Sequence, residues 1–201
     1  MLNEIGILLW RAQEFDAAAS TFKQAVAIRE ALNEQAGRCE ALGNLALVLT
    51  DKGDLEQALV LLNEKLSIAQ KLQARSLIAN AYYNIGTIQH QQKAVDKAID
   101  SFNSAQHVYQ EIGLNDRAVD ILSIMGEICG REGQIGSSLK WFDQSIQLAA
   151  TVEQRTTTGQ RLSNILMLLL ENGYPQIAEQ FVLRLRAIGA QVEIKPDNPN
   201  S

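Results

Sequence analysis

Proline is scarce in this chain, and other absences also narrow the classes of protein it can represent. Only 3 of the 201 residues are proline, namely Pro175, Pro196 and Pro199, and none lies in the interior of an expected helix. No segment alternates polar and apolar residues over the length of a strand, so we expect no β-sheet. An apolar content of 46% with so few helix breakers favours long helices joined by short turns.

A basic surface and a membrane-spanning run are missing as well. The net charge is −5, with 18 Lys+Arg against 23 Asp+Glu and no run of basic residues, so we expect no nucleic-acid partner. No apolar run approaches the roughly 20 residues needed to span a bilayer, which predicts no membrane partner. The N-terminal MLNEIGILLW lacks a basic leader and a cleavage site. We therefore expect a soluble, cytoplasmic protein.

The residues that carry most enzyme chemistry are few and isolated. Cys39 and Cys129 follow no spacing pattern, which favours buried thiols over a disulfide framework. His90 and His107 have no second ligand at a metal-binding spacing. The segment GQIGSSLK at 133–140 lacks the GK[ST] order of a phosphate loop, and no strand precedes it. We expect a non-enzymatic protein with no cofactor and no metal.

What the chain does contain is a set of landmarks that recurs every 40 residues. The clearest copy spans 82–105, where small Gly86 and Ala98 lie on two successive helices beside large Phe102. Positions three and four residues apart share one face of a helix, and small residues beside large ones suit close helix packing. The counterparts of Ala98 and Phe102 are Ala18 and Phe22, Ala58 and Leu62, Ser138 and Phe142, and Ala178 and Val182. Five sets at one period indicate a repeat array.

The pattern predicts paired helices along most of the chain. The expected ranges are 2–12, 15–33, 38–52, 55–72, 77–92, 95–112, 117–132, 135–151, 157–172 and 175–188. Gly53, Gly133 and Gly173 are typical of helix ends in a left-handed conformation, and Pro175 suits a first helical turn. The first helix begins almost at Met1 without a cap, which predicts a truncated first unit or a longer parent chain. Residues 189–201 are predicted to form a mobile tail.

The recurring aromatic, Leu-Gly, Ala and Phe positions resemble the tetratricopeptide repeat over residues 1–188. The resemblance implies an all-α fold, a right-handed α-solenoid of five helix-turn-helix units with about ten antiparallel helices. The units would span about 1–35, 36–75, 76–115, 116–155 and 156–188. A 40-residue unit is longer than the usual one and is similar to that of kinesin light chains and several bacterial regulators. Lys65 replaces a small residue of the pattern, and Leu166 replaces its glycine.

A second series at the same period is not explained by packing. Asn44, Asn84 and Asn164 occupy one place in the repeat, which holds Glu4 and Ile124 in the other two units. In tetratricopeptide superhelices the first helix of each unit lines the concave surface, and in the related long-unit family asparagines at this place grip a peptide backbone. An amide offers a donor and an acceptor, so it matches any peptide group. The alternative is that these asparagines satisfy neighbouring helices within the solenoid.

Other residues on the same helices would give side-chain specificity around a bound backbone. They are Trp10, Arg11, Leu47, Asp51, Tyr83, Thr87, His90, Gln91, Glu127, Arg131 and Met167. Aromatic residues and arginine dominate binding energies, so Trp10, Tyr83 and Arg131 are the first to mutate. The alternative interpretation of each is ordinary exposure.

The fifth unit has an unusual surplus of apolar residues. The run 165–170, ILMLLL, is apolar around the whole helix, so Met167 and Leu170 require cover. Ile177, Phe181 and Ile188 on the last helix have no sixth unit beyond them. Cover could come from a partner's side chains, from the tail, or from a second copy, which gives the hypothesis of a homodimer through the C-terminal unit.

These patterns together predict a protein–protein interaction scaffold. We expect it to bind an extended peptide or a partner segment in the concave groove. Two alternatives remain: a regulatory or sensor module of a longer chain that responds to a peptide signal, and a self-associating structural oligomer. Changing Asn84 and Asn164 to alanine separates them, because loss of a partner and loss of an oligomer are different outcomes.

Overall fold

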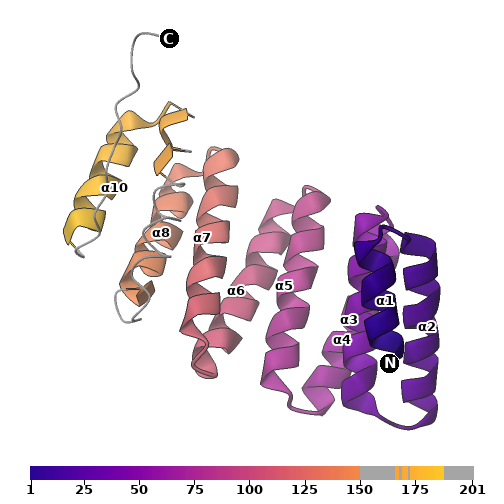
Figure 1. Cartoon of the computed structure of the whole chain (residues 1–201). Coiled ribbons are helices and arrows are strands. Elements are labelled where there is room, and N and C mark those ends of the chain that lie inside the picture. The colour runs from indigo at the N-terminus through magenta and orange to yellow at the C-terminus, as the bar shows by residue number, and fades with distance from the viewer. Residues whose placement is uncertain (150–165, 168, 172, 188–201) are drawn as a thin grey trace. The chain divides into compact units, whose positions relative to one another are not determined.

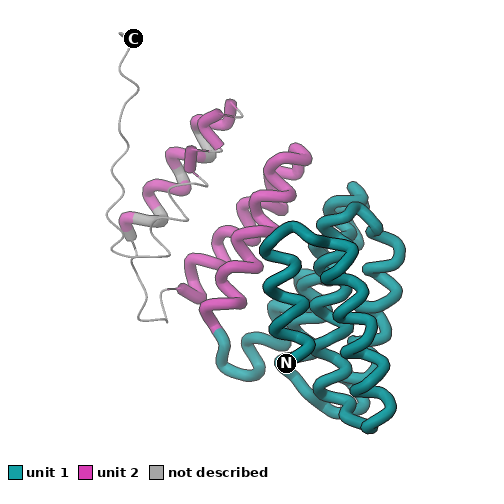
Figure 2. Tube along the Cα trace, turned by 45° about the vertical axis from the view of Figure 1, so that its right-hand side comes forward, with its two compact units in different colours: residues 1–114 teal, residues 115–201 magenta. Residues whose placement is uncertain are grey.

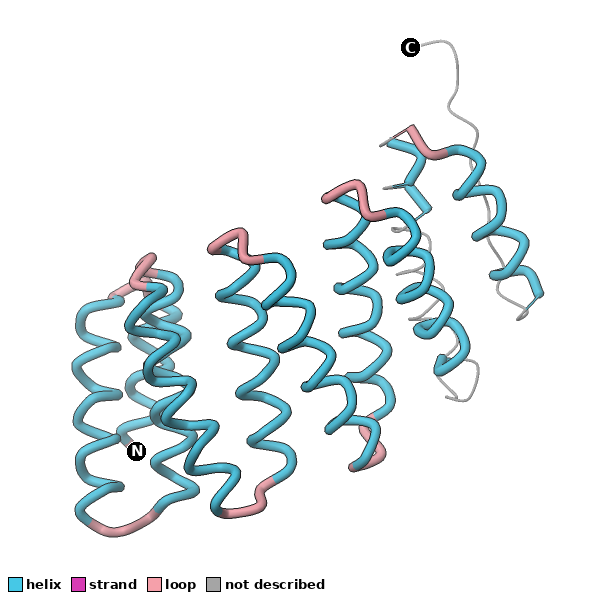
Figure 3. The backbone as a smooth tube through the Cα atoms, turned by 180° about the vertical axis from the view of Figure 1, so that it is seen from behind, coloured by secondary structure: helices cyan, strands magenta, loops and turns pink. Residues whose placement is uncertain are grey.

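The computed structural model of the chain describes residues 1–149, 166, 167, 169–171 and 173–187 (Figure 1). The described helices are α1 (Leu2–Arg11), α2 (Phe15–Ala31), α3 (Gln35–Asp51), α4 (Leu55–Lys71), α5 (Arg75–Gln91), α6 (Val95–Glu111), α7 (Asn115–Arg131), α8 (Ile135–Ala149) and α10 (Pro175–Ala187). Throughout these ranges the chain forms helices and turns and no strand, as Figure 3 shows. The predicted helix ends agree with the observed ones to within three residues. The predicted tail and most of the predicted helix 157–172 lie outside the described residues.

The chain divides into two compact units, which Figure 2 draws in different colours. Unit 1 is Met1–Leu114 and holds α1 to α6, and unit 2 is Asn115–Ser201 and holds α7, α8 and α10. In unit 1 each helix packs on the next along the chain, so α2 joins α1 to α3 and α4 joins α3 to α5. In unit 2, α7 packs on α8. The division of the whole chain into five repeat units stays a prediction.

In three of the described hairpins, a glycine on the first helix faces a phenylalanine ring on the second. A methyl group on Gly86 would lie 2.9 Å from Cδ1 of Phe102, and one on Gly126 would lie 2.3 Å from Cε1 of Phe142. Gly6 and Phe22 make the equivalent contact in the first hairpin. Ordinary contact begins near 3.4 Å, so these helices cross too closely for any larger residue.

The second hairpin solves the same problem with different side chains. Ala46 stands in place of the glycine, and Leu62 stands in place of the phenylalanine. Both residues are almost completely buried. Leucine is smaller than phenylalanine, so the opposing residue has room for a methyl group.

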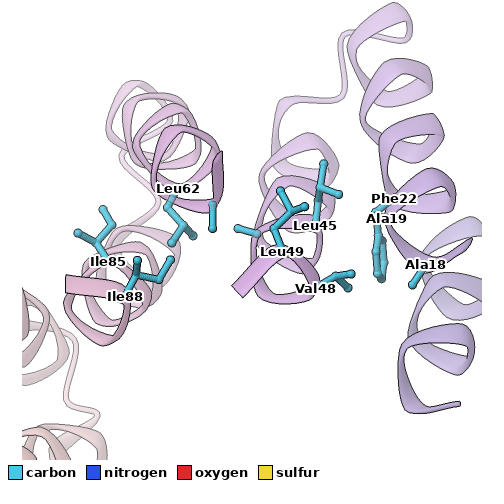
Figure 4. Close-up of a cluster of buried hydrophobic side chains, with 11 residues drawn as sticks. Ala18, Ala19, Phe22, Leu45, Val48, Leu49, Leu62, Ile85 and Ile88 are labelled. Carbon is cyan, nitrogen blue, oxygen red and sulfur yellow. The ribbon is translucent and has the colours of Figure 1, made fainter. Parts of the chain in front are cut away.

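Successive hairpins of unit 1 are joined by one continuous apolar core, shown in Figure 4. Val48 of α3 points toward Phe22 of α2, and Leu62 of α4 lies beside Ile85 and Ile88 of α5. These residues come from neighbouring hairpins and not from one, so no hairpin buries its own apolar surface fully. Stacking of units therefore stabilises unit 1, as expected for a solenoid.

Every described turn contains one residue in the left-handed region. The predicted turn glycines have positive φ, 86° at Gly53, 72° at Gly133 and 78° at Gly173. Residues without glycine's freedom take the same conformation at other turns, with φ of 61° at Gln13 and 60° at Lys93. After Gln13, the Glu14 amide donates to the Leu9 carbonyl at 2.9 Å, the bond of a Schellman motif. The turns thus close through the backbone bonds, and glycine is not required at each one.

Unit 2 contains its own apolar core around two phenylalanine rings. Phe142 of α8 and Phe181 of α10 are both buried, with ring centroids 5.5 Å apart. Leu166 and Leu169 pack into the same cluster, whereas Met167 is 54% exposed and Leu170 is 39% exposed. In the described part of this apolar segment, the buried residues therefore share one side of the helix, and the exposed Met167 and Leu170 share another.

Candidate functional site

Ten of the predicted site residues lie on α1, α3 and α5, the first helices of the three hairpins in unit 1. They are Trp10, Arg11, Asn44, Leu47, Asp51, Tyr83, Asn84, Thr87, His90 and Gln91. These helices lie side by side, since α3 contacts both α1 and α5. We call the surface that these ten residues carry the first-helix face. Arg11, Asp51, Tyr83 and Gln91 are exposed, and the other six are half-buried.

The structure brings two of these residues into direct contact. Nε1 of Trp10 donates a hydrogen bond of 2.7 Å to Oδ2 of Asp51, which links α1 to the C-terminal end of α3. The indole has a single donor, so this bond uses all of its hydrogen-bonding capacity. Trp10 can still offer a ring surface to a ligand, but its polar group already joins the first two hairpins.

Asn44 and Asn84 hold corresponding places on α3 and α5. Each is half-buried, and neither side chain makes a hydrogen bond to another residue in the part of the chain that the structure describes. By contrast, Asn63 on the second helix α4 donates to the Leu59 carbonyl at 2.8 Å, and Asn80 accepts from the Tyr109 hydroxyl. The two repeat-related amides of the first-helix face therefore retain both donor and acceptor for a ligand.

Tyr83 has two roles in the described structure. It is 36% exposed, and its ring packs against the ring of Phe102 with centroids 5.8 Å apart. Its backbone carbonyl accepts a hydrogen bond of 3.1 Å from the Thr87 hydroxyl, so Thr87 is satisfied within its own helix. A mutation of Tyr83 would therefore disturb the hairpin core as well as the first-helix face.

His90 lies near the C-terminal end of α5, and one of its ring nitrogens is buried. Its Nδ1 is buried and has no hydrogen-bond partner among the described residues. No group of three or more His, Cys, Asp or Glu residues within the described ranges could hold a metal ion. The structure therefore gives His90 no second ligand for metal binding within those ranges.

The remaining predicted site residues belong to unit 2 or lie outside the described part. Glu127 is half-buried and Arg131 is exposed, both on α7, while Met167 is exposed. Asn164 falls outside the described residues. Ile124, which replaces asparagine in this unit, is half-buried on α7.

Lys65 was not among the predicted site residues, and the sequence shows it only as a departure from the repeat pattern. Lys65 of α4 is 6% exposed, and burial lowers the pKa of its ammonium group below the usual 10.5. A methyl group on Gly43 would lie 2.7 Å from its Nζ, so the ammonium group occupies the space next to Gly43. Both departures are visible in the sequence. Lys65 is large where the repeat has a small residue, and Gly43 is small where the next repeat has the large residue Tyr83.

Both cysteines are buried. Burial is the largest influence on Cys39 and raises the pKa of its thiol, although nearby Lys65 and Arg38 oppose the shift. Its Sγ lies 3.6 Å from the Lys65 carbonyl oxygen, to which it donates a weak hydrogen bond. A thiol with a raised pKa is a poor nucleophile, so Cys39 serves the packing of α3 on α4.

The helical hairpins, their stacking and their 40-residue period define an all-α repeat protein of the solenoid class. Two matches to family models, both described as tetratricopeptide repeat, cover residues 3–69 and 37–111. The chain belongs to the tetratricopeptide repeat family. The predicted fold class is thereby confirmed. No helix in the described ranges combines the length and apolar character needed to cross a membrane.

Solved structures with the same fold differ widely in sequence from this chain. BtubC (BKLC) from P. vanneervenii is 15% identical with a TM-score of 0.76, covering 100% of this chain and 84% of its own. A putative kinesin light chain from Podosopora anserina with nearly identical TPR-like repeats is 16% identical with a TM-score of 0.74, covering 94% and 93%.

A third structure is the Rap conjugation gene regulator of the plasmid pLS20 in complex with the Phr* peptide. It is 14% identical with a TM-score of 0.63, and the match covers 94% of this chain but 62% of that chain. This chain therefore spans less than two thirds of the length of that regulator. A comparison with curated protein sequences finds no match.

Proposed function

We propose that this chain is a protein-interaction module whose first-helix face binds an extended peptide or partner segment. The observation that carries the proposal is the pair of unbonded amides, Asn44 and Asn84, at one repeat position on adjacent first helices. Each amide can accept from a backbone N–H and donate to a backbone carbonyl. This mode of recognition holds the backbone whatever its side chains are, and nearby residues then select the sequence.

The spacing of the two amides suits an extended ligand. Packed helices lie roughly 8–10 Å apart, and an extended chain rises about 3.3 Å per residue. Amides on neighbouring first helices would therefore meet peptide groups about three residues apart. Leu47 on α3 and Thr87 on α5 lie one helical turn from these asparagines on the same helix faces, so they would contact neighbouring side chains of the ligand.

The known peptide complex of the similar Rap regulator is consistent with this proposal for this chain. A regulatory module that responds to a peptide signal is the second candidate, and the same complex favours it. In both cases we infer that the chain acts by binding and not by catalysis. The proposed absence of enzymatic activity rests on two observations. No group of His, Cys, Asp or Glu residues within the described ranges could hold a metal ion, and both cysteines are buried.

Selection from a random peptide display library tests the binding proposal directly. Peptides enriched on the wild-type chain should lose at least tenfold in affinity for an Asn44→Ala, Asn84→Ala double variant, because both amides are removed. Asn63→Ala is the matched control, since Asn63 lies on a second helix and bonds its own backbone. Peptides that bind the double variant as tightly as the wild type would disprove the role of the amides.

A further inference from the structure

The side of α1 that points away from α2 is apolar and exposed. Leu8 is 64% exposed and Ile5 is 43% exposed, and Met1 and Ala12 on the same side are exposed as well. Gly6, on the opposite side of the helix, is buried against α2. Residues three, four and seven positions apart share one face of a helix, so the four exposed residues form one row, which we call the α1 stripe. A single exposed apolar residue is ordinary, but four in a row form a surface suited to packing.

In the following first helices the same repeat positions are covered. The counterparts of Ile5 and Leu8, 40 residues later on α3, are Leu45 and Val48, which are only 3% and 0% exposed. Both lie in the apolar core that contains Phe22 of α2. The two counterparts on α5 are also buried. In unit 1 this side of a first helix therefore receives the second helix of the hairpin before it, and on α1 no described helix takes that place.

The last described helix does not offer a matching surface for the α1 stripe of another copy. Ala19 of α2 belongs to the core that covers α3, and its counterpart on α10 is Glu179, which is exposed. Stacking α10 of one copy on α1 of another would remove this carboxylate from water against an apolar row. Such a head-to-tail contact would also continue into an open filament. A closed pair requires a surface that matches itself.

Two opposite charges border the α1 stripe along one edge. Glu4 lies in the first turn of α1 and Arg11 in the last, and both are exposed. They are seven residues apart, so they lie on one line along the helix. When two α1 helices pack antiparallel about a two-fold axis, Glu4 of each copy lies opposite Arg11 of the other. Parallel packing would instead leave the two charged edges on opposite sides of the contact.

The present partner of Glu4 does not compete strongly with such a pair. Its carboxylate lies 3.2 Å from the terminal ammonium group of Met1, and both groups are exposed. Exposed ion pairs contribute little to stability, so Glu4 remains available to a second copy. Ion pairs at the rim of an interface mainly fix its orientation, and here they favour the antiparallel one.

We propose that a second copy of this chain covers the α1 stripe, through antiparallel packing of the two α1 helices about a two-fold axis beside Leu8. The two Leu8 side chains would be neighbours at the centre, and Ala12 of one copy would lie between Met1 and Ile5 of the other, small beside large. Because α1 has 10 residues, it is about 15 Å long, and the interface is smaller than the roughly 1,600 Å² of a standard one. We expect a weak dimer, with a Kd of roughly 10 μM to 1 mM.

Sedimentation velocity on the whole chain, up to about 1 mM, tests the dimer. Leu8→Glu should weaken it about a hundredfold, because two carboxylates would meet at the centre of the interface. Leu8 is exposed in the single chain, so the circular dichroism spectrum should not change. Val60→Glu is the matched control, since Val60 is 67% exposed on α4, outside the α1 stripe, and the dimer should persist.

Three results would overturn the proposal. A wild-type chain that stays monomeric up to about 1 mM excludes the second copy and leaves the α1 stripe to a helix of another protein. A dimer that Leu8→Glu does not weaken uses a different surface, such as the C-terminal unit. Equal weakening by Leu8→Glu and Val60→Glu would show that added charge, and not the α1 stripe, controls association.

Reversal of charge tests the antiparallel orientation. Glu4→Arg and Arg11→Glu should each weaken self-association about tenfold, because each places like charges opposite one another. An equimolar mixture of the two variants should restore dimers of wild-type strength, since both pairs again join opposite charges. Mixing does not alter the helix of either chain, so this rescue cannot come from folding. A mixture that sediments no faster than the separate variants rules out the antiparallel arrangement.

The dimer and the proposed peptide binding fail independently. Leu8 is not part of the first-helix face, so the monomeric Leu8→Glu chain should bind selected peptides through Asn44 and Asn84 as the wild type does. Arg11 belongs to both surfaces, and its charge reversal is therefore followed by sedimentation without peptide. If the dimer forms but no selected peptide depends on the two asparagines, this inference stands and the proposed function fails. A monomeric wild type that binds such peptides has the opposite meaning.

Discussion

Adding one methyl group at a hairpin crossing tests the packing that defines the repeat. In Gly86→Ala the new methyl group would lie 2.9 Å from the Phe102 ring, about 0.5 Å inside the 3.4 Å at which ordinary contact begins. In Gly126→Ala the distance to Phe142 is 2.3 Å, an overlap of about 1.1 Å. Phe142 is 1% exposed and packs on the Phe181 ring, so it has little freedom to move.

The expected free-energy changes follow from two opposing effects. Overpacking of a core costs about 1–3 kcal/mol, and alanine gains about 1 kcal/mol over glycine within a helix. The smaller overlap should leave Gly86→Ala destabilised by about 1 kcal/mol, and the larger one should leave Gly126→Ala destabilised by about 2 kcal/mol. Gly136 in α8 is the control, because its methyl group would meet nothing within 4 Å, so Gly136→Ala should be neutral or stabilising.

Urea unfolding followed by circular dichroism measures these differences. The second hairpin already combines Ala46 with Leu62, so Phe102→Leu should rescue Gly86→Ala in a double-mutant cycle with a coupling of about 1 kcal/mol. Additive effects of the two substitutions would refute the small-against-large argument. The argument would also be refuted if Gly126→Ala were as stable as Gly86→Ala or more stable.

Three further predictions concern a buried charge, a turn and a contact between hairpins. Lys65→Met should stabilise the fold by about 1 kcal/mol at pH 7, since a largely buried lysine with no ion pair among the described residues is replaced by an apolar side chain of similar length. Because the folded-state pKa of Lys65 lies below 10.5, the unfolded chain binds more protons between these two values. Wild-type stability should therefore rise with pH over that interval, and the advantage of Lys65→Met in thermal unfolding should shrink toward pH 10.5; an advantage independent of pH would contradict the assignment. Lys93→Gly should stabilise by up to about 1 kcal/mol in urea unfolding, because φ at Lys93 is 60°, whereas Gly53→Ala, with φ of 86°, should destabilise by a similar amount. Trp10→Phe should cost about 1 kcal/mol in urea unfolding through loss of the 2.7 Å bond to Asp51, and an unchanged midpoint would show that water replaces this bond.

The periodicity of the chain predicted most of the fold of unit 1. Gly86, Ala98 and Phe102 were identified as packing residues from their spacing alone, and all three are buried. Glycine was a sufficient signal for the turn at Gly53 but not for the turn at Lys93, where the backbone bonds impose a left-handed residue. Local sequence cannot show this, because those bonds depend on the direction in which the next helix leaves.

The candidate site could be predicted only as a set of positions. The repeat register placed Asn44 and Asn84 at one place on adjacent helices, and their side chains make no bonds among the described residues. The bond between Trp10 and Asp51 joins residues 41 positions apart and depends on how two helices meet. The Lys65 ammonium group lies beside α3 because the facing residue, Gly43, has no side chain. The repeat pattern alone does not show which residues of two helices face each other.

In the second hairpin the small residue Gly43 lies on the first helix and the large residue Lys65 on the second. The hairpins are therefore not interchangeable modules. In the third hairpin the large residue is Tyr83 on the first helix, and the small one is Ala105 on the second. A recombinant chain that joined α5 to α4 would oppose Tyr83 with Lys65 and overfill the space, and the reciprocal pair Gly43 with Ala105 would leave a void. Duplication or shuffling of repeats in this chain must therefore transfer whole hairpins, with each first helix kept beside its own second helix.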